Sequence, residues 1–504
     1  MQASTYPSFQ IQPDWNRALH DKDDCIWLHQ YSQGGTSYHK LSIQEEGFVS
    51  DCGDFDCTIV SPNLLQLTSK LRDFKRTFQC PDSIHSSNFS GDKRLKTHLS
   101  CMDMSPSGEL ILSATSDHVV SLWESSTGHV RRTLEGHVGE VYTCRFFPSG
   151  LAALTGGADM QLKIWCLLSG RCAATLAPGC AGALTGNSPS HPLEPGGHRA
   201  GVLDTGILNR GRNIVAIDRS GWLRLWDVST QTCISGIPLV PSANLAQANR
   251  VVCEEATCLA VKVQPGMDIS GSQCLPDQSS WYQVYETASR KATEVGTANA
   301  LVAVGMGIGA AVQLYEVDSR QKGCVARVTL PNNSGAVESI AFVQRRVADE
   351  VGGPIRLVAD FDHPPSSFLD NALFAGGQNG ELACWDLRSL KNPIWQLTGE
   401  KGAVHFIRAV DAQDGQSAHL IVGRSDGRVM VYLCSPATNA VRHRVEFKSV
   451  LRSTLELTGI NCEPIRGIAA RSPVSGTGLS VCTASLSGVF RFYRELATDV
   501  AFHI

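Results

Sequence analysis

Two stretches of the sequence align with each other without a gap, and this repeat constrains the fold more than any other feature. One stretch runs from Ser105 to Trp123 and the other from Phe147 to Trp165. The Asp and Trp of the first copy, Asp117 and Trp123, recur as Asp159 and Trp165, 42 residues further along. A period of about 40–45 residues that closes on an apolar strand is typical of one four-stranded blade of a β-propeller.

The strand ending of this repeat recurs along the chain. It alternates apolar and variable residues, follows a turn rich in Gly, Asp, Asn or Ser, and closes on an aromatic residue, which is the pattern of a half-buried strand. It occurs seven times, ending at Trp123, Trp165, Trp226, Tyr315, Trp385, Tyr432 and Tyr493. We therefore predict an all-β protein, a seven-bladed WD-repeat β-propeller over residues 91–496.

Residues 1–90 lie outside the repeat. Short β-like segments at Ile26–Leu28, Tyr38–Ile43 and Thr58–Val60 predict a small β-rich N-terminal domain. We expect its last segment to supply a strand that closes the ring, because closure removes exposed sheet edges. The segments Gly179–Gly197 and Gln264–Ala298 are rich in Gly, Pro or polar residues and are interpreted as loops between strands.

A buried polar network is predicted within the second blade. A His at the blade entrance can bond the turn Asp, while a Thr on the second strand holds the indole N–H of the Trp, since buried polar groups need such partners. The full set is His137, Thr155, Asp159 and Trp165. A catalytic role is the alternative, but we favour a structural tetrad.

The neighbouring blades carry incomplete versions of this set. The first has Ser113, Asp117 and Trp123, but Leu95 stands at its His position and His98 is three residues out of register. The third has His198 and Trp226, with Ser220 at the Asp position and Ala216 at the Thr position.

Composition and motifs argue against several classes of protein. With 44 Lys and Arg against 48 Asp and Glu, the net charge is −4, which disfavours nucleic-acid binding. The run Leu301–Leu314 is too short to cross a membrane, and the first thirty residues show no secretory signal. The 18 Cys residues are expected to be reduced, in the cytosol or nucleus, and none forms the C-x-x-C pair of a zinc site.

No cofactor, metal site or catalytic residue is predicted. Gly305, Gly307 and Ala310 imitate a dinucleotide-binding turn, but a strand pattern follows where a helix should begin. The chain contains no phosphate-loop G-K-[ST] or H-E-x-x-H motif. We therefore expect a non-enzymatic protein.

Four segments resemble one known family. They are IQPDWNRAL from Ile11, followed by Trp27; LEGHVGEVYTCRFFPSGLAALTGGADMQLKIW from Leu134; GHRAGVLDTGILNRGRNIVAIDRSGWLRLWD from Gly197; and LELTGINCEP from Leu455. These are similar to the proteasomal ATPase-associated factor family, WD-repeat proteins with a distinct N-terminal segment.

That resemblance implies a chaperone of proteasome assembly. It would bind the C-terminal regions of ATPase subunits in the base of the regulatory particle and delay docking onto the core particle, as a monomer without a cofactor. The alternative is a generic WD-repeat adaptor, either a substrate receptor of a ubiquitin ligase or a chromatin scaffold. The IQPDW segment favours the first, because a generic adaptor has no need of it.

Contact residues are predicted from their position in the repeat. Side chains just before the turn Asp, or three residues after the entrance His, should lie near one rim of the ring. This set comprises His98, Glu140, Ala158, Arg219, Gln378 and Ser425. Glu140, Arg219 and Gln378 are the preferred partner-binding candidates because polar or charged groups can pair with a partner, the alternative being ordinary solvated rim residues.

Overall fold

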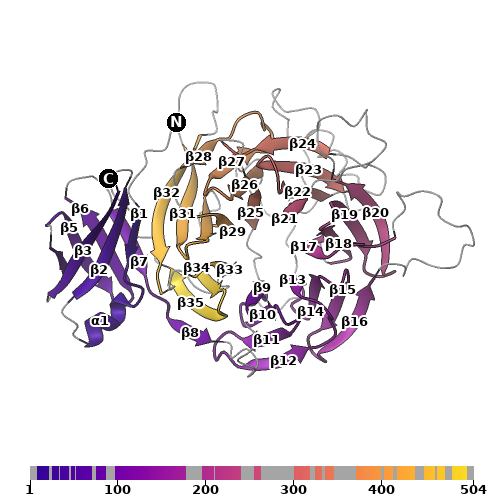
Figure 1. Cartoon of the computed structure of the whole chain (residues 1–504), viewed down its shortest axis with the longest axis horizontal. Helices are drawn as coiled ribbons and strands as arrows, with labels where there is room; N and C mark the ends of the chain where they lie inside the picture. The colour runs from indigo at the N-terminus through magenta and orange to yellow at the C-terminus, as the bar shows by residue number, and fades with distance from the viewer. Residues whose placement is uncertain are drawn as a thin grey trace, which may run out of the picture.

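A computed structural model of the 504-residue chain shows a ring of β-sheets with a smaller β-sheet unit beside it (Figure 1). Among the described residues, one short helix, α1 (Trp15–Asp21), accompanies 35 strands. The structure describes residues 8–21, 25–32, 35–44, 47–51, 53–70, 75–86, 97–177, 196–208, 211–239, 255–262, 300–317, 324–331, 335–344, 371–398, 402–412, 417–437, 448–459, 463–471 and 479–496. Leu95 and nearly all of the two predicted loops lie outside these residues.

Five four-stranded antiparallel sheets stand separately in the ring. Two of them are built from the 42-residue repeat identified in the sequence. The first comprises β9 (Leu99–Met104), β10 (Leu110–Thr115), β11 (Val120–Glu124) and β12 (Val130–Leu134). The second comprises β13 (Val141–Phe146), β14 (Ala152–Gly157), β15 (Leu162–Cys166) and β16 (Arg171–Leu176).

The other three separate sheets follow the same pattern. One holds β17 (Val202–Leu208), β18 (Asn213–Asp218), β19 (Trp222–Asp227) and β20 (Thr232–Pro238). The next holds β21 (Ala256–Lys262), β22 (Ala300–Met306), β23 (Ala311–Val317) and β24 (Cys324–Thr329). The last combines β33 (Ile465–Arg471), β34 (Leu479–Ser485) and β35 (Val489–Leu496) with β8 (Ser83–Ser86).

The remaining ring strands belong to one 15-stranded sheet, so the predicted seven separate blades are not observed: five are separate. This sheet contains two antiparallel groups. They are β25 (Val337–Gln344), β26 (Ala372–Gly377), β27 (Leu382–Asp386) and β28 (Trp395–Leu397), and β29 (Val404–Asp411), β30 (Ala418–Arg424), β31 (Val429–Ala437) and β32 (Lys448–Leu457). A short parallel pairing of β25 with β29 joins the groups.

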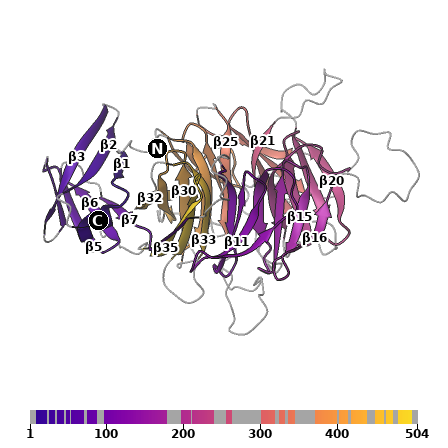
Figure 2. The same cartoon turned by 60° about the horizontal axis from the view of Figure 1, so that its bottom comes forward.

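The N-terminal strands continue the same sheet through a parallel pairing of β7 with β32. Figure 2 shows them as a separate layer beside the ring. Their strands are β1 (Ser8–Ile11), β2 (Cys25–Ser32), β3 (Gly35–Gln44), β4 (Gly47–Ser50), β5 (Phe55–Ser61), β6 (Leu64–Ser69) and β7 (Lys75–Gln79). The three β segments predicted here lie within β2, β3 and β5, whereas β1 and α1 were not predicted.

The ring is closed by strands from distant parts of the chain. β8 pairs antiparallel with β35, which confirms that the end of the N-terminal region supplies a closing strand. The first strands of the groups contact one another in the order β9, β13, β17, β21, β25, β29 and β33, and β33 contacts β9. These first strands form the innermost layer of the ring (Figure 1).

Burial between adjacent sheets holds the ring together. The β14 and β15 side chains Leu154 and Leu162 pack in one cluster with Ile214 and Trp226 of the next sheet. At Gly156 the approach is so close that an added Cβ would lie 2.9 Å from the Val202 side chain, so this position requires Gly. The N-terminal unit has its own core, in which Trp15 of α1 is completely buried.

Candidate functional site: one rim of the ring and the N-terminal junction

The structure brings together all four residues of the predicted tetrad. His137 Nδ1 lies 2.7 Å from Asp159 Oδ2, and its Nε2 lies 2.7 Å from Thr155 Oγ1. Trp165 donates its indole N–H to the same Thr155 oxygen at 2.8 Å. Since that oxygen accepts from Trp165, the Thr155 hydroxyl can donate to Nε2, which leaves the proton on Nδ1 for Asp159. The His137 side chain is fully buried.

Electrostatics favour an ionised Asp159. Burial by itself raises its pKa, but the hydrogen bond and charge interaction with His137, with further bonds from the Gln161 and Val138 amides, bring the net pKa below its ordinary value. Its two oxygens are bonded to His137 and to the Val138 and Gln161 amides. The network therefore ties the blade entrance, the second strand and the third strand to one another.

The sheet β17–β20 carries a variant of this network that the sequence did not reveal. Asp218, not Ser220, bonds His198, with Asp218 Oδ2 2.9 Å from His198 Nδ1. Ser220 instead donates its hydroxyl to Asp218 at 2.6 Å. Because Ala216 offers no hydroxyl, Trp226 donates directly to His198 Nε2 at 3.3 Å. The missed signal is an Asp two residues before the expected position, as the last residue of β18.

The sheet β9–β12 retains only the inner part of the network. Trp123 donates to Ser113 Oγ at 2.7 Å, and Asp117 accepts from the Thr115 hydroxyl. His98, which the sequence placed out of register, is not paired with the turn Asp: its Nε2 lies 3.5 Å from Glu140 of the next sheet.

The predicted rim residues occupy equivalent backbone positions. In each group the residue after the second strand donates its amide to the residue just before the first strand. The pairs are Ser116 to His98, Ala158 to Glu140, Arg219 to Gly201, Gln378 to Ala336 and Ser425 to Ala403, all at 2.8–2.9 Å. The same bond links Gly307 to Glu255 and Leu486 to Pro464. The six candidates therefore lie on one rim.

Two of the three preferred candidates, Glu140 and Arg219, belong to adjacent sheets, and the third belongs to a sheet further round the ring. Glu140 accepts a hydrogen bond from Ser100 Oγ at 2.8 Å. The guanidinium of Arg219 lies over the ring of Tyr142 in β13, 5.6 Å from its centroid, whereas Glu140 is held from β9. Gln378 lies beyond the intervening β21–β24 sheet, where its side chain accepts from the Ala336 amide at 3.4 Å.

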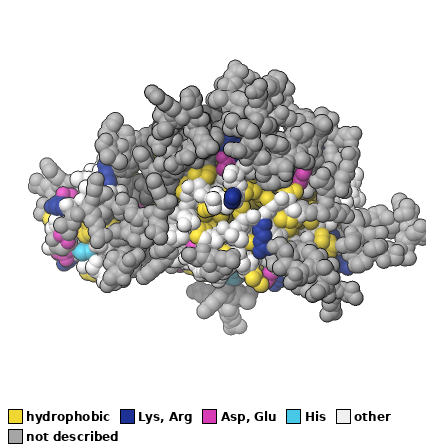
Figure 3. Space-filling model, turned by 90° about the horizontal axis from the view of Figure 1, so that it is seen from above, with side chains coloured by type: hydrophobic (Ala, Val, Ile, Leu, Met, Phe, Trp, Pro, Cys, Tyr) yellow, Lys and Arg dark blue, Asp and Glu magenta, His cyan; other side chains and the backbone are white. Residues whose placement is uncertain are grey.

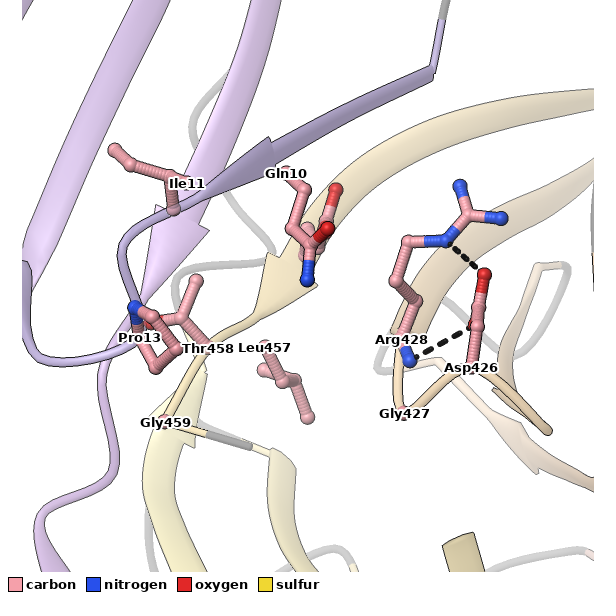
Figure 4. Close-up of a pocket in the computed structure, with 10 residues that line it drawn as sticks. Gln10, Ile11, Pro13, Asp426, Gly427, Arg428, Leu457, Thr458 and Gly459 are labelled. Atoms are coloured by element: carbon pink, nitrogen blue, oxygen red, sulfur yellow. Dashed lines mark hydrogen bonds and ion pairs between the residues drawn. The ribbon is translucent and has the colours of Figure 1, made fainter. Parts of the chain in front are cut away.

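A shallow cleft lies where the N-terminal unit meets the ring (Figure 4). Gln10, Ile11 and Pro13 form one wall, and residues 426–428 and 456–459 form the other. Figure 4 shows Arg428 paired with Asp426, with Nε 2.7 Å from Oδ2. Two of the sequence segments that carry the family resemblance, IQPDW and LELTG, thus face each other here.

Hydrogen bonds around Thr458 fix this junction. Its amide and its hydroxyl both donate to the Gln79 carbonyl, at 2.8 and 3.1 Å. Its hydroxyl also lies 3.3 Å from Cys80 Sγ, and Tyr493 donates its hydroxyl to the Thr458 carbonyl at 2.5 Å. The LELTG segment therefore connects the N-terminal unit to two groups of ring strands.

Within the described part of the chain, no group of three or more His, Cys, Asp and Glu side chains could hold a metal ion. No described helix is long and apolar enough to cross a membrane. Figure 3 shows hydrophobic, basic and acidic side chains interspersed over the described part of one face.

Comparison with known proteins first defines the class. The family model described as "WD domain, G-beta repeat" matches residues 81–124 and 128–166, which cover β8–β15. The chain therefore contains WD repeats within an all-β propeller.

Several known proteins that resemble this chain share one name. Proteasomal ATPase-associated factor 1 from Homo sapiens is 32% identical over 149 residues, which cover 28% of this chain and 36% of the human protein. The Gallus gallus protein of the same name is 33% identical over 153 residues, 29% of this chain and 37% of that protein. In Dictyostelium discoideum, "Probable proteasomal ATPase-associated factor 1" is 31% identical over 155 residues, covering 30% and 35%. The resemblance inferred from the sequence is supported, over little more than a third of these relatives' length.

Proposed function

We propose that this protein is a non-catalytic interaction scaffold that acts in assembly of the proteasome regulatory particle. In this proposal it binds the C-terminal regions of ATPase subunits in the base and delays their docking to the core particle. The similarity to proteins named proteasomal ATPase-associated factor 1 is the observation that carries the proposal. A rigid propeller that presents loops at its rim suits such a role.

The proposed architecture is a seven-bladed propeller at residues 91–496 preceded by an N-terminal domain at residues 1–90. The two antiparallel groups inside the 15-stranded sheet would be two further blades, the fifth and sixth around the ring, which brings the total to seven. Two observations support this count: the rim hydrogen bond repeated in every group, and the closed order of first strands. The β8 strand would then be contributed to the propeller from the N-terminal side of the boundary.

We propose Glu140, Arg219 and Gln378 as contacts on this rim, and His137, Thr155, Asp159 and Trp165 as a structural tetrad. The buried side chains of the tetrad support a structural role, since their polar atoms are bonded to one another. Glu140 is paired with Ser100 and His98, yet it retains an exposed fraction of 31% that a partner can reach. The protein would act as a monomer in the cytosol or nucleus.

A direct binding experiment tests this function. The full chain is immobilised, and purified C-terminal domains of the base ATPase subunits are passed over it in biolayer interferometry. Binding of at least one domain is expected. The double variant Glu140→Arg with Arg219→Glu should weaken that binding at least about fivefold, or about 1 kcal/mol.

The matched control is Arg131→Glu, because Arg131 is an exposed Arg on the outer strand β12. It should leave the affinity unchanged. Absence of binding by every base ATPase domain contradicts the proposed function. Binding that both rim changes leave intact keeps the function but removes these residues from the contact surface.

A further inference from the structure

An exposed apolar surface lies on the rim of the second sheet, β13–β16, beside the tetrad. Val138 exposes 84% of its surface and Met160 exposes 38%, and Ala158 is also exposed. The tetrad fixes the backbone beneath them, because the Val138 amide donates to Asp159 Oδ2 at 3.4 Å and Met160 directly follows Asp159. Exposed apolar groups gathered at one place are a feature of interaction surfaces.

These residues are in contact with one another and with the third sheet, β17–β20. A Cβ placed on Gly139, which follows Val138, would lie 3.1 Å from the Ala158 side chain. A Cβ placed on Gly201 of the third sheet would lie 3.3 Å from the Ala158 Cα and 3.4 Å from the Tyr142 ring. We call the surface formed by Val138, Gly139, Ala158 and Met160 the apolar patch.

Met160 occupies a turn position at which most groups of the ring carry Gly. The position lies two residues after the amide that makes the repeated rim hydrogen bond. In the first two sheets it is His118 and Met160, with φ of 62° and 61°. In the other five groups it is a Gly with φ between 75° and 85°, namely Gly221, Gly309, Gly380, Gly427 and Gly488.

A side chain at this position of the second sheet strains the turn and does not contribute to the core. Left-handed backbone is unfavourable for a residue with a Cβ, whereas Gly adopts it freely. Local strain of this kind is concentrated at functional sites. Methionine is flexible and polarisable, so it adapts to an apolar partner. Met160 therefore combines a strained backbone with an exposed side chain that is suited to binding.

Two arginines of the third sheet border the apolar patch. The guanidinium of Arg219 lies over the Tyr142 ring, 5.6 Å from its centroid, and Arg199 directly follows the buried His198 at the entrance of the sheet. Both arginines are exposed, and neither has an acidic partner among the described residues. Their positive charges are therefore available to a partner.

The carboxylates of this part of the rim lie toward the first sheet, β9–β12. Glu140 is held by Ser100 and His98 of that sheet, at 2.8 and 3.5 Å. Glu135 directly follows β12, the outer strand of the same sheet. The apolar patch thus has an acidic side toward the first sheet and a basic side toward the third.

We propose that the apolar patch and the two arginines dock an extended protein segment in which apolar side chains alternate with carboxylates. An apolar side chain of the segment packs on Met160 and Val138. Its carboxylates pair with Arg199 and Arg219, since guanidinium groups match carboxylate oxygens and complementary charge orients a partner. The inference rests on the proposed function only for the protein that supplies the segment, a base ATPase subunit.

Fluorescence polarisation with short fluorescein-labelled peptides tests this surface on the full chain. The probe alternates Glu and Leu, and two matched peptides replace either every Glu by Lys or every Leu by Ser. The Glu–Leu peptide should bind with a dissociation constant on the order of 0.1 mM, as one apolar anchor with ion pairs allows. Both matched peptides should bind at least about tenfold more weakly, because each lacks one half of the complementarity.

Variants assign the binding to the patch and separate it from folding. Met160→Gly should weaken binding of the Glu–Leu peptide at least about fivefold, because the apolar contact is lost. Its urea unfolding midpoint should not fall, because Gly relieves the left-handed strain. Arg199→Glu with Arg219→Glu should weaken binding of the Glu–Leu peptide and strengthen binding of the Lys–Leu peptide. The control Leu168→Ser, at an apolar residue exposed by 68% at the opposite end of the sheet, should bind as the unaltered protein does.

The inference is overturned if the Glu–Leu peptide does not bind saturably, or if the Lys–Leu peptide binds equally well. It is also overturned if Met160→Gly and the arginine variant bind the Glu–Leu peptide as tightly as the unaltered protein. The same variants, tested against the base ATPase domains, keep the two proposals apart. A domain that binds all variants equally overturns the inference and leaves the proposed function intact. Peptide binding without binding of any domain supports the inference and contradicts the proposed function.

Discussion

Removing the turn Asp of the tetrad is expected to destabilise the ring far more than removing the equivalent Asp of the preceding sheet. In Asp159→Ala, the fully buried His137 loses the partner of its Nδ1, 2.7 Å away. A buried donor left unsatisfied costs about 1–3 kcal/mol. The network continues from His137 to Thr155 and Trp165, so the cost also includes weaker restraint of the second and third strands.

Asp117→Ala is the matched control. It removes an Asp at the same point of the repeat, but this Asp accepts from the Thr115 hydroxyl and has no His partner among the described residues. We expect a loss below about 1 kcal/mol, as for one ordinary hydrogen bond.

Urea unfolding of both variants, followed by tryptophan fluorescence, measures the difference. Hydrogen exchange of residues 152–166 should report faster opening in Asp159→Ala, because β14 and β15 carry the network. Equal unfolding midpoints for the two variants would refute the reasoning, since they would show that the His pairing contributes nothing.

Three further predictions follow from the same structure. Burial lowers the pKa of His198 below its ordinary 6.5, although Asp218 opposes this. Below pH 6.5 the unfolded chain therefore binds a proton at His198 more readily than the folded chain does. The unfolding free energy should fall as the pH drops below 6.5 and should level off above it. A His198→Gln variant whose unfolding free energy has the same pH dependence would contradict this. Thr458→Val should lower the unfolding free energy by about 1 kcal/mol and speed exchange where β7 meets β32, because the Gln79 carbonyl loses one donor; unchanged exchange there would exclude this anchoring role. Glu140→Arg with Arg219→Glu should leave the melting temperature unchanged, since the contacts of Glu140 with Ser100 and His98 and of Arg219 with Tyr142 are solvent-accessible and contribute little; a clear drop in differential scanning fluorimetry would show that the rim contacts stabilise the fold.

The repeat made the propeller predictable because its information is local. Turn residues, alternating apolar positions and a closing aromatic lie within about 20 residues of one another in each copy, as at Asp159 and Trp165. The rim positions followed from the same register, since one backbone hydrogen bond places Arg219 and Gln378 at equivalent points.

Other features depend on contacts that a single sequence does not display. The pairing of β7 with β32 joins segments 378 residues apart at Glu456 and Phe78, and it merges sheets that the repeat pattern treats as separate. The role of Asp218 was not predicted, because the repeat pattern places the Asp at position 220. In the structure, the carboxylate two residues earlier in the sequence bonds His198 instead. The engagement of Glu140 by Ser100 depends on the packing of adjacent sheets, which the register alone does not define.

Capture of the tagged full-length chain from native cytosol, with identification of its partners by mass spectrometry, tests the central claim most directly. We expect base ATPase subunits of the regulatory particle to be recovered with it, without stoichiometric core particle. A ubiquitin-ligase scaffold or a chromatin complex in place of these ATPases would contradict it.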